Sequence, residues 1–148
     1  MFYISEIMNV APVTFKTELQ KTVYETLEKL NIPFKRVDTD EAITMNDCVA
    51  INEKLDMKMV KTLFLCNRQQ TEFYLFITQG DKPFRSKDFS HVLDIARVSF
   101  APAELLYNMM GTNIGAATVL SALIDATNRV RVVFDSEVVR EEWYGCSD

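Results

Sequence analysis

The sequence predicts an α+β domain in which helices flank a mixed β-sheet. Two apolar segments, 60–66 and 73–78, are rich in the β-branched and aromatic residues that favour strands. The polar residues 67–72 between them are typical of a hairpin loop. One-faced helical patterns precede and follow this pair, at 17–30 and 86–95. Because the strands are joined both by a hairpin and by helices, a mixed sheet is expected.

Local signals mark the ends of the elements in the N-terminal half. Asn31 is expected to end the first helix, and Pro33 prevents it from resuming. A short strand is expected at 34–37. Thr44 followed by Asp47 resembles a capping box, which predicts a second helix that runs to about residue 55.

Similar signals continue through the C-terminal half. Ser86 is expected to cap the helix that follows the hairpin. Pro102 suits the first turn of another helix, and Gly111 suits the position just after its end. Further strands are expected at 97–100, 116–123 and 130–134.

Length and composition indicate one globular domain over residues 1–148, with residues 1–16 as a loose N-terminal arm. The chain is 48% hydrophobic and 25% charged, the balance of a globular protein. A chain of this length buries enough surface to fold without disulfides or metal ions. No apolar run approaches the ~20 residues of a membrane span, so no membrane association is expected.

The three cysteines, Cys48, Cys66 and Cys146, are odd in number and widely spaced, which argues against a disulfide framework. The first residues lack a basic segment followed by an apolar block, so no secretory signal is expected. Together these features predict a cytoplasmic protein.

The net charge of −5 excludes a protein that coats long stretches of DNA or RNA. Charge is nevertheless uneven: residues 54–87 contain seven basic and three acidic side chains, a net +4, which leaves −9 for the rest. Two interpretations remain open, a basic binding surface and an ordinary solvated face.

Lys61 stands at the start of an otherwise apolar strand, where lysine is uncommon. Its ammonium must reach a surface or a cleft, because lysine is seldom fully buried. One interpretation is a charge that protects the strand end from aggregation. The functional interpretation is a point charge that holds a phosphate.

A glycine-containing turn is the second candidate. Gly111 and Gly115 are two of only four glycines in the chain. Such a turn lets backbone N–H groups approach a ligand and stabilise an oxyanion. The alternative is a helix end followed by an ordinary turn. Candidate substrate-binding residues in or beside the turn are Thr112, Asn113, Ile114, Ala116 and Thr118.

Common catalytic motifs are missing. The single histidine, His91, lies in a predicted helix and is interpreted as a surface or core residue rather than a base. Cys66 is interpreted as a buried packing residue. The sequence contains no metal-ligand spacing, P-loop, dinucleotide fingerprint or nucleophile elbow. If the protein is an enzyme, it is expected to work mainly by positioning and backbone dipoles.

Four segments together resemble the YbaK-type, prolyl-tRNA-synthetase-associated editing domains. Val60–Leu65 is similar to the lysine-bearing strand of that family, and Arg97–Leu106 to its strand-to-helix segment. Gly111–Ala116 falls where the family has its glycine-rich turn, and Val130–Asp135 resembles its late strand ending in Asp. Because no synthetase body is attached, the freestanding ProX/PrdX-type members are the expected relatives.

The resemblance implies a mixed, barrel-like sheet and a trans-editing deacylase, with no metal or organic cofactor. Members hydrolyse the ester that joins a wrong amino acid, typically alanine or cysteine, to tRNA for proline. Lys61 matches the family lysine, which is expected to anchor the tRNA 3′ end, and Gly111 and Gly115 match the turn beside the ester. The expected partners are tRNA(Pro) and prolyl-tRNA synthetase.

The sequence also departs from the family pattern. Ile114 stands where the turn usually has proline, and 117–121 lacks the usual Val-Thr-Pro-Phe-Gly. Residues 144–148 occupy the place of a His-Pro-x-x-Asn segment, so a C-terminus shortened relative to the family is expected. These departures leave open a non-catalytic module that binds a tRNA end, an amino acid or a synthetase. A third hypothesis, which does not rest on the departures, is a thiol-dependent enzyme that uses Cys66 or Cys146.

Overall fold

The computed structural model of the chain describes residues 2–41, 44–110, 118–123 and 129–146. Its helices are α1 (Glu18–Lys29), α2 (Met45–Leu55), α3 (Ser86–Leu93), α4 (Ala103–Met110), the 3-10 helix η1 (Val119–Leu123) and α5 (Ser136–Val139). Its strands are β1 (Val60–Asn67), β2 (Phe73–Gln79), β3 (Val98–Phe100) and β4 (Val130–Phe134). This succession of helices and strands confirms the α+β prediction.

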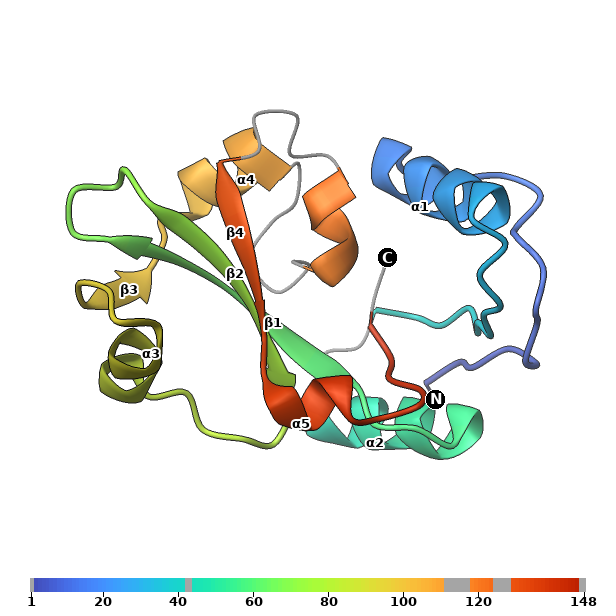
Figure 1. Ribbon diagram of the computed structural model, residues 1–148. Coiled ribbons are helices and arrows are strands. Elements are labelled where there is room, and N and C mark those ends of the chain that lie inside the picture. The colour runs from blue at the N-terminus through green and yellow to red at the C-terminus, as the bar shows by residue number, and fades with distance from the viewer. Residues whose placement is uncertain (1, 42–43, 111–117, 124–128, 147–148) are drawn as a thin grey trace.

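The strands form one mixed sheet in the order β3-β1-β2-β4 (Figure 1). β1 and β2 pair antiparallel from Val60 opposite Gln79 to Cys66 opposite Phe73, as the hairpin prediction requires. β3 adds antiparallel to β1, and β4 adds parallel to β2. In the part of the chain that the structure describes, β3 and β4 are the edges of the sheet, so the expected mixed sheet flanked by helices is present and is not closed.

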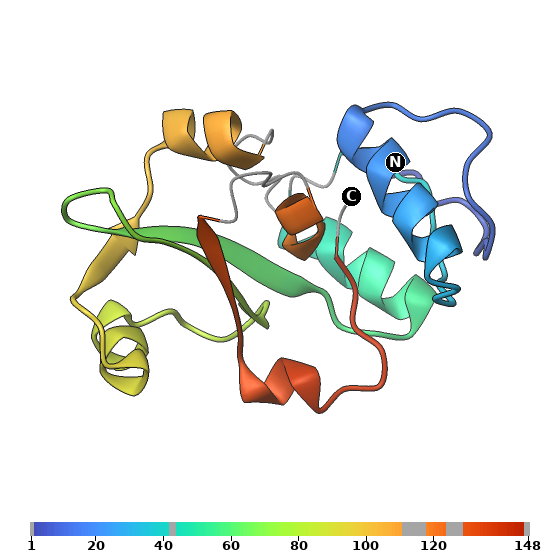
Figure 2. The ribbon, with the colours of Figure 1, turned by 45° about the horizontal axis from the view of Figure 1, so that its top comes forward.

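Helices cover both faces of this sheet. α4 and α3 lie on opposite sides of it (Figure 2). The α4 face is a cluster that includes Phe64, Cys66, Leu75, Ile77, Leu106 and Met110. The α3 face is a cluster that includes Leu65, Tyr74, Phe89 and Val98. Successive strand residues therefore point to alternate faces, and each face buries its own apolar core.

Two of the predicted helix boundaries are confirmed in detail. Asn31 has a φ of 54° directly after the C-cap of α1, the left-handed conformation that ends a helix. At α2, the Thr44 hydroxyl accepts the Asp47 N–H at 3.1 Å, and the Asp47 carboxylate accepts the Thr44 N–H at 3.0 Å. This reciprocal pair is the predicted capping box.

The N-terminal segment lies along residues 36–40. Met8 and Arg36 exchange backbone hydrogen bonds of 2.9 and 2.7 Å, and the Ser5 N–H donates to the Asp38 carbonyl at 2.8 Å. The strand expected at 34–37 is wrong, because that segment takes part in pairing only through an isolated bridge at Arg36.

The strand expected at 116–123 and the cap expected at Ser86 are also wrong, because serine and threonine hydroxyls there form other hydrogen bonds. Residues 119–123 form η1 instead of a strand, since the Thr118 carbonyl accepts the Ser121 N–H at 2.9 Å and the Ser121 hydroxyl accepts the Thr118 N–H at 3.3 Å. Ser86 is the first residue of α3 rather than its cap, and its hydroxyl donates to the Val98 carbonyl at 2.5 Å. That bond ties α3 to β3.

Candidate functional site

Lys61 lies at one end of the sheet, on the face that α3 covers. It is the second residue of β1 and pairs with Thr78 of β2. Its neighbour Val60 packs on the α4 face, and Leu63 packs on the α3 face, so the alternation of the strand directs Lys61 to the α3 face. The half-buried Lys61 side chain donates a hydrogen bond from Nζ to the main-chain carbonyl of Lys82.

Asp135 is the centre of a polar cluster at this end of the sheet. It follows β4 directly, and the parallel pairing of Ile77 with Phe134 brings it beside Thr78. Its Oδ2 accepts the Thr78 hydroxyl at 2.9 Å and the Lys82 ammonium at 2.8 Å. Its Oδ1 accepts the Glu137 N–H at 3.1 Å and so caps α5.

The charges in this cluster shift the protonation equilibria of two groups. Burial raises the pKa of Asp135, but hydrogen bonds from Lys82, the Glu137 N–H and Thr78 outweigh it and hold that pKa below its ordinary value. The pKa of Lys82 is raised, because its ammonium bonds to Asp135 and, at 3.3 Å, to Glu137. Both groups are therefore ionised at neutral pH.

The two lysines of the cluster differ in charge compensation. Lys82 has two carboxylate partners, Asp135 and Glu137. Across 2–41, 44–110, 118–123 and 129–146, no ion pair involves Lys61, whose bond to Lys82 is to a neutral carbonyl. Lys61 thus keeps an uncompensated positive charge, which can attract an anion.

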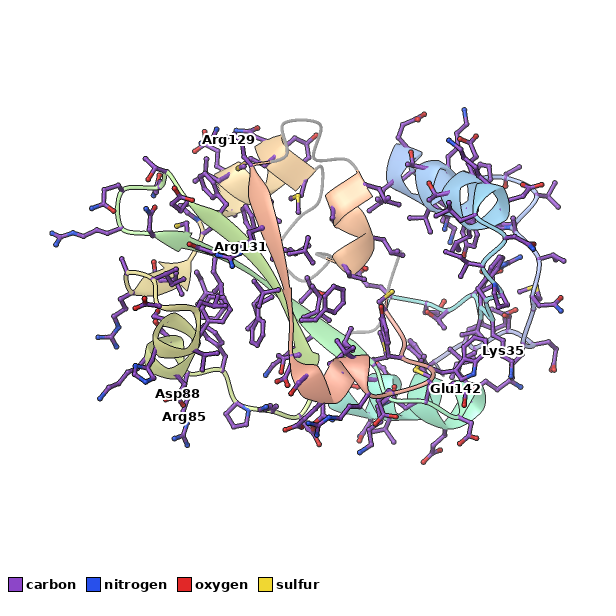
Figure 3. All side chains as sticks on the ribbon, in the orientation of Figure 1. Lys35, Arg85, Asp88, Arg129, Arg131 and Glu142 are labelled. Carbon is purple, nitrogen blue, oxygen red and sulfur yellow. The ribbon has the colours of Figure 1, made fainter. Side chains whose placement is uncertain are left out.

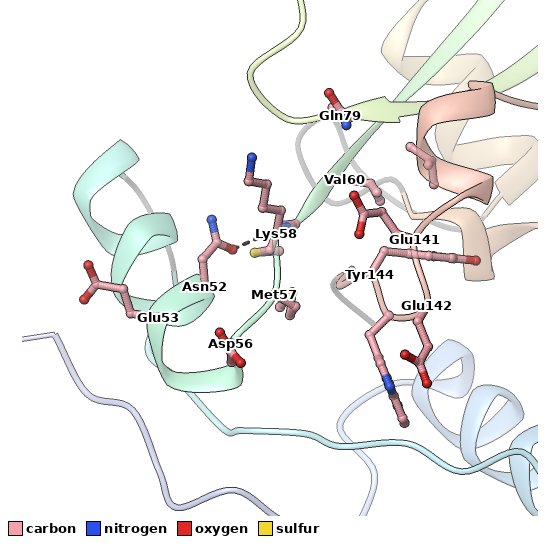
Figure 4. A pocket seen from close by; sticks show the side chains of 13 residues that line it. Asn52, Glu53, Asp56, Met57, Lys58, Val60, Gln79, Glu141, Glu142 and Tyr144 are labelled. Carbon is pink, nitrogen blue, oxygen red and sulfur yellow. Dashed lines mark hydrogen bonds between the residues drawn. The ribbon is translucent and has the colours of Figure 1, made fainter.

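A cavity of about 520 Å³ lies beside this cluster, on the other side of β1 (Figure 4). Val60 and Gln79, the sequence neighbours of Lys61 and Thr78, form part of its wall. The rest comes mainly from the end of α2, the segment before β1 and the C-terminal segment, including Asn52, Met57, Lys58, Glu141, Trp143 and Tyr144.

The C-terminal segment is fixed against the start of β1. The Gly145 N–H donates to the Lys58 carbonyl at 3.2 Å, and the Val60 N–H donates to the Gly145 carbonyl at 2.9 Å. At the cavity wall, the Asn52 side chain accepts the Met59 N–H at 3.1 Å. The cavity is therefore bounded by segments that hydrogen bonds hold in place.

Most of the predicted glycine-turn residues lie outside the described residues. This applies to Gly111, Thr112, Asn113, Ile114, Gly115 and Ala116. Thr118 is described and only 1% exposed; its N–H and hydroxyl bond within its own turn, to Ser121 and Leu120. Met110 and Val119, which flank the turn, pack on the α4 face, opposite the face to which Lys61 belongs.

The basic residues of segment 54–87 do not gather on one surface. Lys54 pairs with Glu6 at 3.8 Å, Lys61 and Lys82 lie at one end of the hairpin, and Arg68 lies in its loop. Figure 3 shows Arg85 beside Asp88 on the side of α3 away from the sheet. This distribution favours the solvated-face interpretation for the segment as a whole, with Lys61 as the exception.

His91 and Cys66 lie where the sequence analysis expects them. His91 is exposed on α3, and Cys66 is 2% exposed in the α4-face core, as interpreted. Within the described ranges, no group of three or more His, Cys, Asp or Glu side chains could hold a metal ion. No helix in those ranges is long and apolar enough to cross a bilayer.

Sequence reasoning did not select Thr78, Lys82, Asp135 or Glu137 as site residues. The signal for Asp135 was present, as an acidic residue directly after an apolar strand. The signal for Lys82 was weak, since a lysine in a loop is ordinary. Only the register of β2 with β1 and β4 shows that Thr78 lies opposite Lys61 and beside Asp135. Lys82 then contacts Lys61 through its carbonyl and Asp135 through its ammonium.

Comparison with known proteins places the chain in a family. The aminoacyl-tRNA editing domain matches residues 39–147. The prolyl-tRNA editing protein ProX of Acetoanaerobium sticklandii is 26% identical over 126 residues, which cover 82% of this chain and 74% of ProX. The prolyl-tRNA synthetase associated domain-containing protein 1 of Danio rerio is 27% identical over 129 residues, covering 87% and 67% of the two chains.

A solved structure supports the fold. The crystal structure of hypothetical protein APE2540 superposes with a TM-score of 0.64 at 16% sequence identity, covering 86% of this chain and 83% of the other. At this identity the likeness concerns the fold alone. The sequence match over residues 39–147 carries the assignment, and the chain belongs to the aminoacyl-tRNA editing domain family.

Proposed function

We propose that this protein is a trans-editing deacylase that hydrolyses the ester of mischarged tRNA(Pro), with Ala-tRNA(Pro) as the leading substrate. The observation that carries the proposal is the half-buried Lys61 ammonium, which bonds to a neutral carbonyl while its neighbour Lys82 is compensated by two carboxylates. The editing-domain match and the similarity to ProX supply the reaction class.

In this proposal Lys61 anchors a phosphate near the 3′ end of the tRNA. An ammonium with spare donors makes charge-assisted hydrogen bonds to phosphate oxygens. Exchange of the neutral Lys82 carbonyl for a phosphate oxygen replaces a charge–dipole contact of Lys61 with a charge–charge contact, which favours the phosphate. An acidic protein can bind tRNA in this way when contact is confined to the acceptor end.

The ester itself lowers the demand on the enzyme. Water adds to the ester carbonyl, and cleavage of the C–O bond releases the amino acid and restores the ribose hydroxyl. An aminoacyl ester is more reactive than an amide, so positioning and oxyanion stabilisation suffice without a strong base. We assign oxyanion stabilisation to the backbone of Gly111 and Gly115, with Thr112, Asn113, Ile114 and Ala116 shaping the amino-acid pocket. The buried Thr118, whose polar groups bond to Ser121 and Leu120, would support the pocket from behind rather than contact the substrate.

Selectivity for alanine follows from size. A pocket that admits alanine can exclude the bulkier proline by steric overlap, which is the principle of a second sieve. Prolyl-tRNA synthetase, which would release the mischarged tRNA, is the expected functional partner. Ile114, in place of the family proline, is the residue most expected to alter the pocket.

The test is deacylation of Ala-, Cys- and Ser-tRNA(Pro) by wild type, Lys61→Ala and Lys87→Ala. Lys87 is exposed on α3, so its replacement is a control for the loss of one positive charge. Loss of anchoring is expected to lower kcat/KM of Lys61→Ala by about 10- to 100-fold. Lys87→Ala should match wild type, and the charged species that wild type clears fastest identifies the substrate.

Two results would contradict the proposal. Undiminished hydrolysis by Lys61→Ala would remove the role of the lysine. The absence of hydrolysis of all three species by wild type, combined with binding of a non-hydrolysable aminoacyl-adenosine analogue, would instead establish a non-catalytic binding module.

A further inference from the structure

Lys82 connects the candidate lysine to the end of β4. It lies in the loop between β2 and α3, just after the turn at Gly80. Its main-chain carbonyl accepts the Lys61 ammonium. Its own ammonium contacts Asp135 at 2.8 Å and Glu137 at 3.3 Å. One residue therefore holds Lys61 through its backbone and is itself held through its side chain.

The anchor for Lys82 is well fixed. The Asp135 side chain is 8% exposed, and it also accepts hydrogen bonds from Thr78 and from the Glu137 N–H. These bonds tie it to β2 and to the first turn of α5. The Lys82 side chain is 41% exposed and extends from the loop to this fixed point.

Other contacts also restrain the loop that carries Lys82. The Lys82 N–H donates to the Gln79 carbonyl at 3.1 Å, which closes the turn. A Cβ placed on Gly80 would lie 3.0 Å from the Met59 carbonyl oxygen, so the turn packs closely on the residue before β1. After Lys82, Pro83 restricts the Lys82 backbone to extended conformations. The Phe84 ring packs against Phe76, Phe89 and Phe100, with centroids 6.0, 5.9 and 5.7 Å apart. The loop is thus held on both sides of Lys82, and the ion pairs hold Lys82 itself between these points.

Lys82 is poorly suited to bind substrate itself. Two carboxylates lie against one ammonium, so an approaching phosphate would meet a local excess of negative charge. Lys61 has no such carboxylate partner in the described part of the chain. The geometry thus gives the two lysines different roles: the Lys61 ammonium can bind an anion, and Lys82 holds that ammonium in position.

We infer that Lys82 is a positioning residue for Lys61: its ion pairs with Asp135 and Glu137 hold the loop so that its carbonyl directs the Lys61 ammonium. The catalytic consequence of this inference rests on the proposed function, whereas the positional consequence does not. When the ion pairs are removed, the Lys61 ammonium should become more mobile and more accessible to reagents, and any activity that depends on it should fall.

The first measurement needs no substrate. Wild type, Lys82→Met and Lys82→Arg are treated with limiting formaldehyde and borohydride, and methylation of each lysine is quantified by mass spectrometry, with the exposed Lys87 as internal reference. Lys61 in Lys82→Met is expected to react roughly three- to tenfold faster than in wild type, because a local restraint is lost. Lys82→Arg, which keeps the charge, should restore slow labelling.

The second measurement separates positioning from general stability. In the wild-type background, Lys82→Met is expected to lower kcat/KM about tenfold, because Lys61 loses its orientation. If Lys82 acts through Lys61, the same substitution should have no further effect on kcat/KM in a Lys61→Ala background. An equal loss in both backgrounds overturns the inference. If wild type shows no deacylation, the proposed function fails, and the labelling result alone decides the role of Lys82.

Labelling of Lys61 at the wild-type rate in a folded Lys82→Met protein, as judged by circular dichroism, also overturns the inference. Glu137→Gln is the milder variant for the case in which Lys82→Met does not fold, since it removes one partner and leaves Asp135. It should increase Lys61 labelling by a smaller factor, and an unchanged rate in that variant counts against the inference in the same way.

Discussion

The Thr78 hydroxyl donates to Asp135 Oδ2 at 2.9 Å, and through this bond the carboxyl ends of β2 and β4 are joined. The other carboxylate oxygen of Asp135 caps α5. The Asp135 side chain thus links β4 to β2, caps α5 and forms an ion pair with the Lys82 ammonium. The polar end of the sheet depends on it more than on any lysine.

The stability of the protein should therefore depend on the charge of Asp135. Asn at this position keeps a capping group but loses the charge, which is expected to cost about 1–2 kcal/mol in the free energy of unfolding at pH 7. Because the pKa of Asp135 is lowered in the folded state, its contribution is complete above the unfolded aspartate pKa of about 3.9 and is lost as pH falls through the folded value.

Urea denaturation of wild type and Asp135→Asn between pH 7 and pH 2.5 measures this. The difference between the two proteins should be constant near neutrality and should shrink as the pH falls below about 4. A difference that stays the same down to pH 2.5 would show that the carboxylate charge is not what stabilises this end of the sheet.

The capping box of α2 provides a local test. Thr44→Ala removes the acceptor of the Asp47 N–H and should destabilise the protein by about 1 kcal/mol. The control is Asn46→Ala, an exposed position in the same turn, which should be neutral or slightly stabilising because alanine favours helices. Equal effects of the two substitutions on the urea midpoint would argue against the cap.

Features set by local sequence could be predicted. The hairpin appears at β1 and β2 because its strands are continuous runs of strand-forming residues with a polar loop between them. Asn31 and the Thr44–Asp47 pair act within a few residues, so the sequence carries the whole signal. Lys61 was recognised because a lysine in such a strand is unusual.

Features that depend on residues distant in the sequence could not be predicted. Serine is a common helix cap, but the Ser86 hydroxyl instead donates a hydrogen bond to the Val98 carbonyl across the α3–β3 connection. The segment containing Thr118 and Ser121 has strand-forming composition, yet its hydroxyls and carbonyls close a 3-10 turn. The contacts of Lys82 with Lys61 and with Asp135 depend on the register of β2 with β1 and β4, which no local pattern encodes.

The two described glycines near the site should tolerate alanine differently. At Gly80 the new methyl group would lie 3.0 Å from the Met59 carbonyl oxygen, a backbone atom that cannot move alone. At Gly145 it would overlap the Met57 thioether, at 2.1 and 2.2 Å, but that flexible side chain can rotate away. Gly80→Ala is expected to cost about 1–3 kcal/mol and Gly145→Ala less.

Thermal unfolding of both glycine variants decides between these expectations. Gly80→Ala should also accelerate methylation of Lys61, because the turn that carries Lys82 would be displaced. If Gly145→Ala proves the more destabilising, the contact between the C-terminal segment and Met57 is tighter than the flexibility of methionine suggests.

The thiols provide the last test, and it bears on the thiol-dependent alternative. None of the three cysteines is in a disulfide, and Cys66 is buried while Cys48 and Cys146 are partly exposed. Burial raises the pKa of the Cys66 thiol, and a hydrogen bond with Ser99 lowers it less. At pH 7 to 8, Cys66 should therefore contain less thiolate than an ordinary thiol and react slowly with a disulfide reagent.

A colorimetric titration with such a reagent should show two fast thiols and a third that reacts only after denaturant is added. If deacylation requires no thiol, the Cys66→Ser, Cys146→Ser double variant should retain full activity per folded molecule. The opposite result would be a complete loss of activity in the folded double variant, together with rapid labelling of Cys66 in wild type. That result would indicate a cysteine nucleophile and would contradict the proposal that activity depends mainly on Lys61.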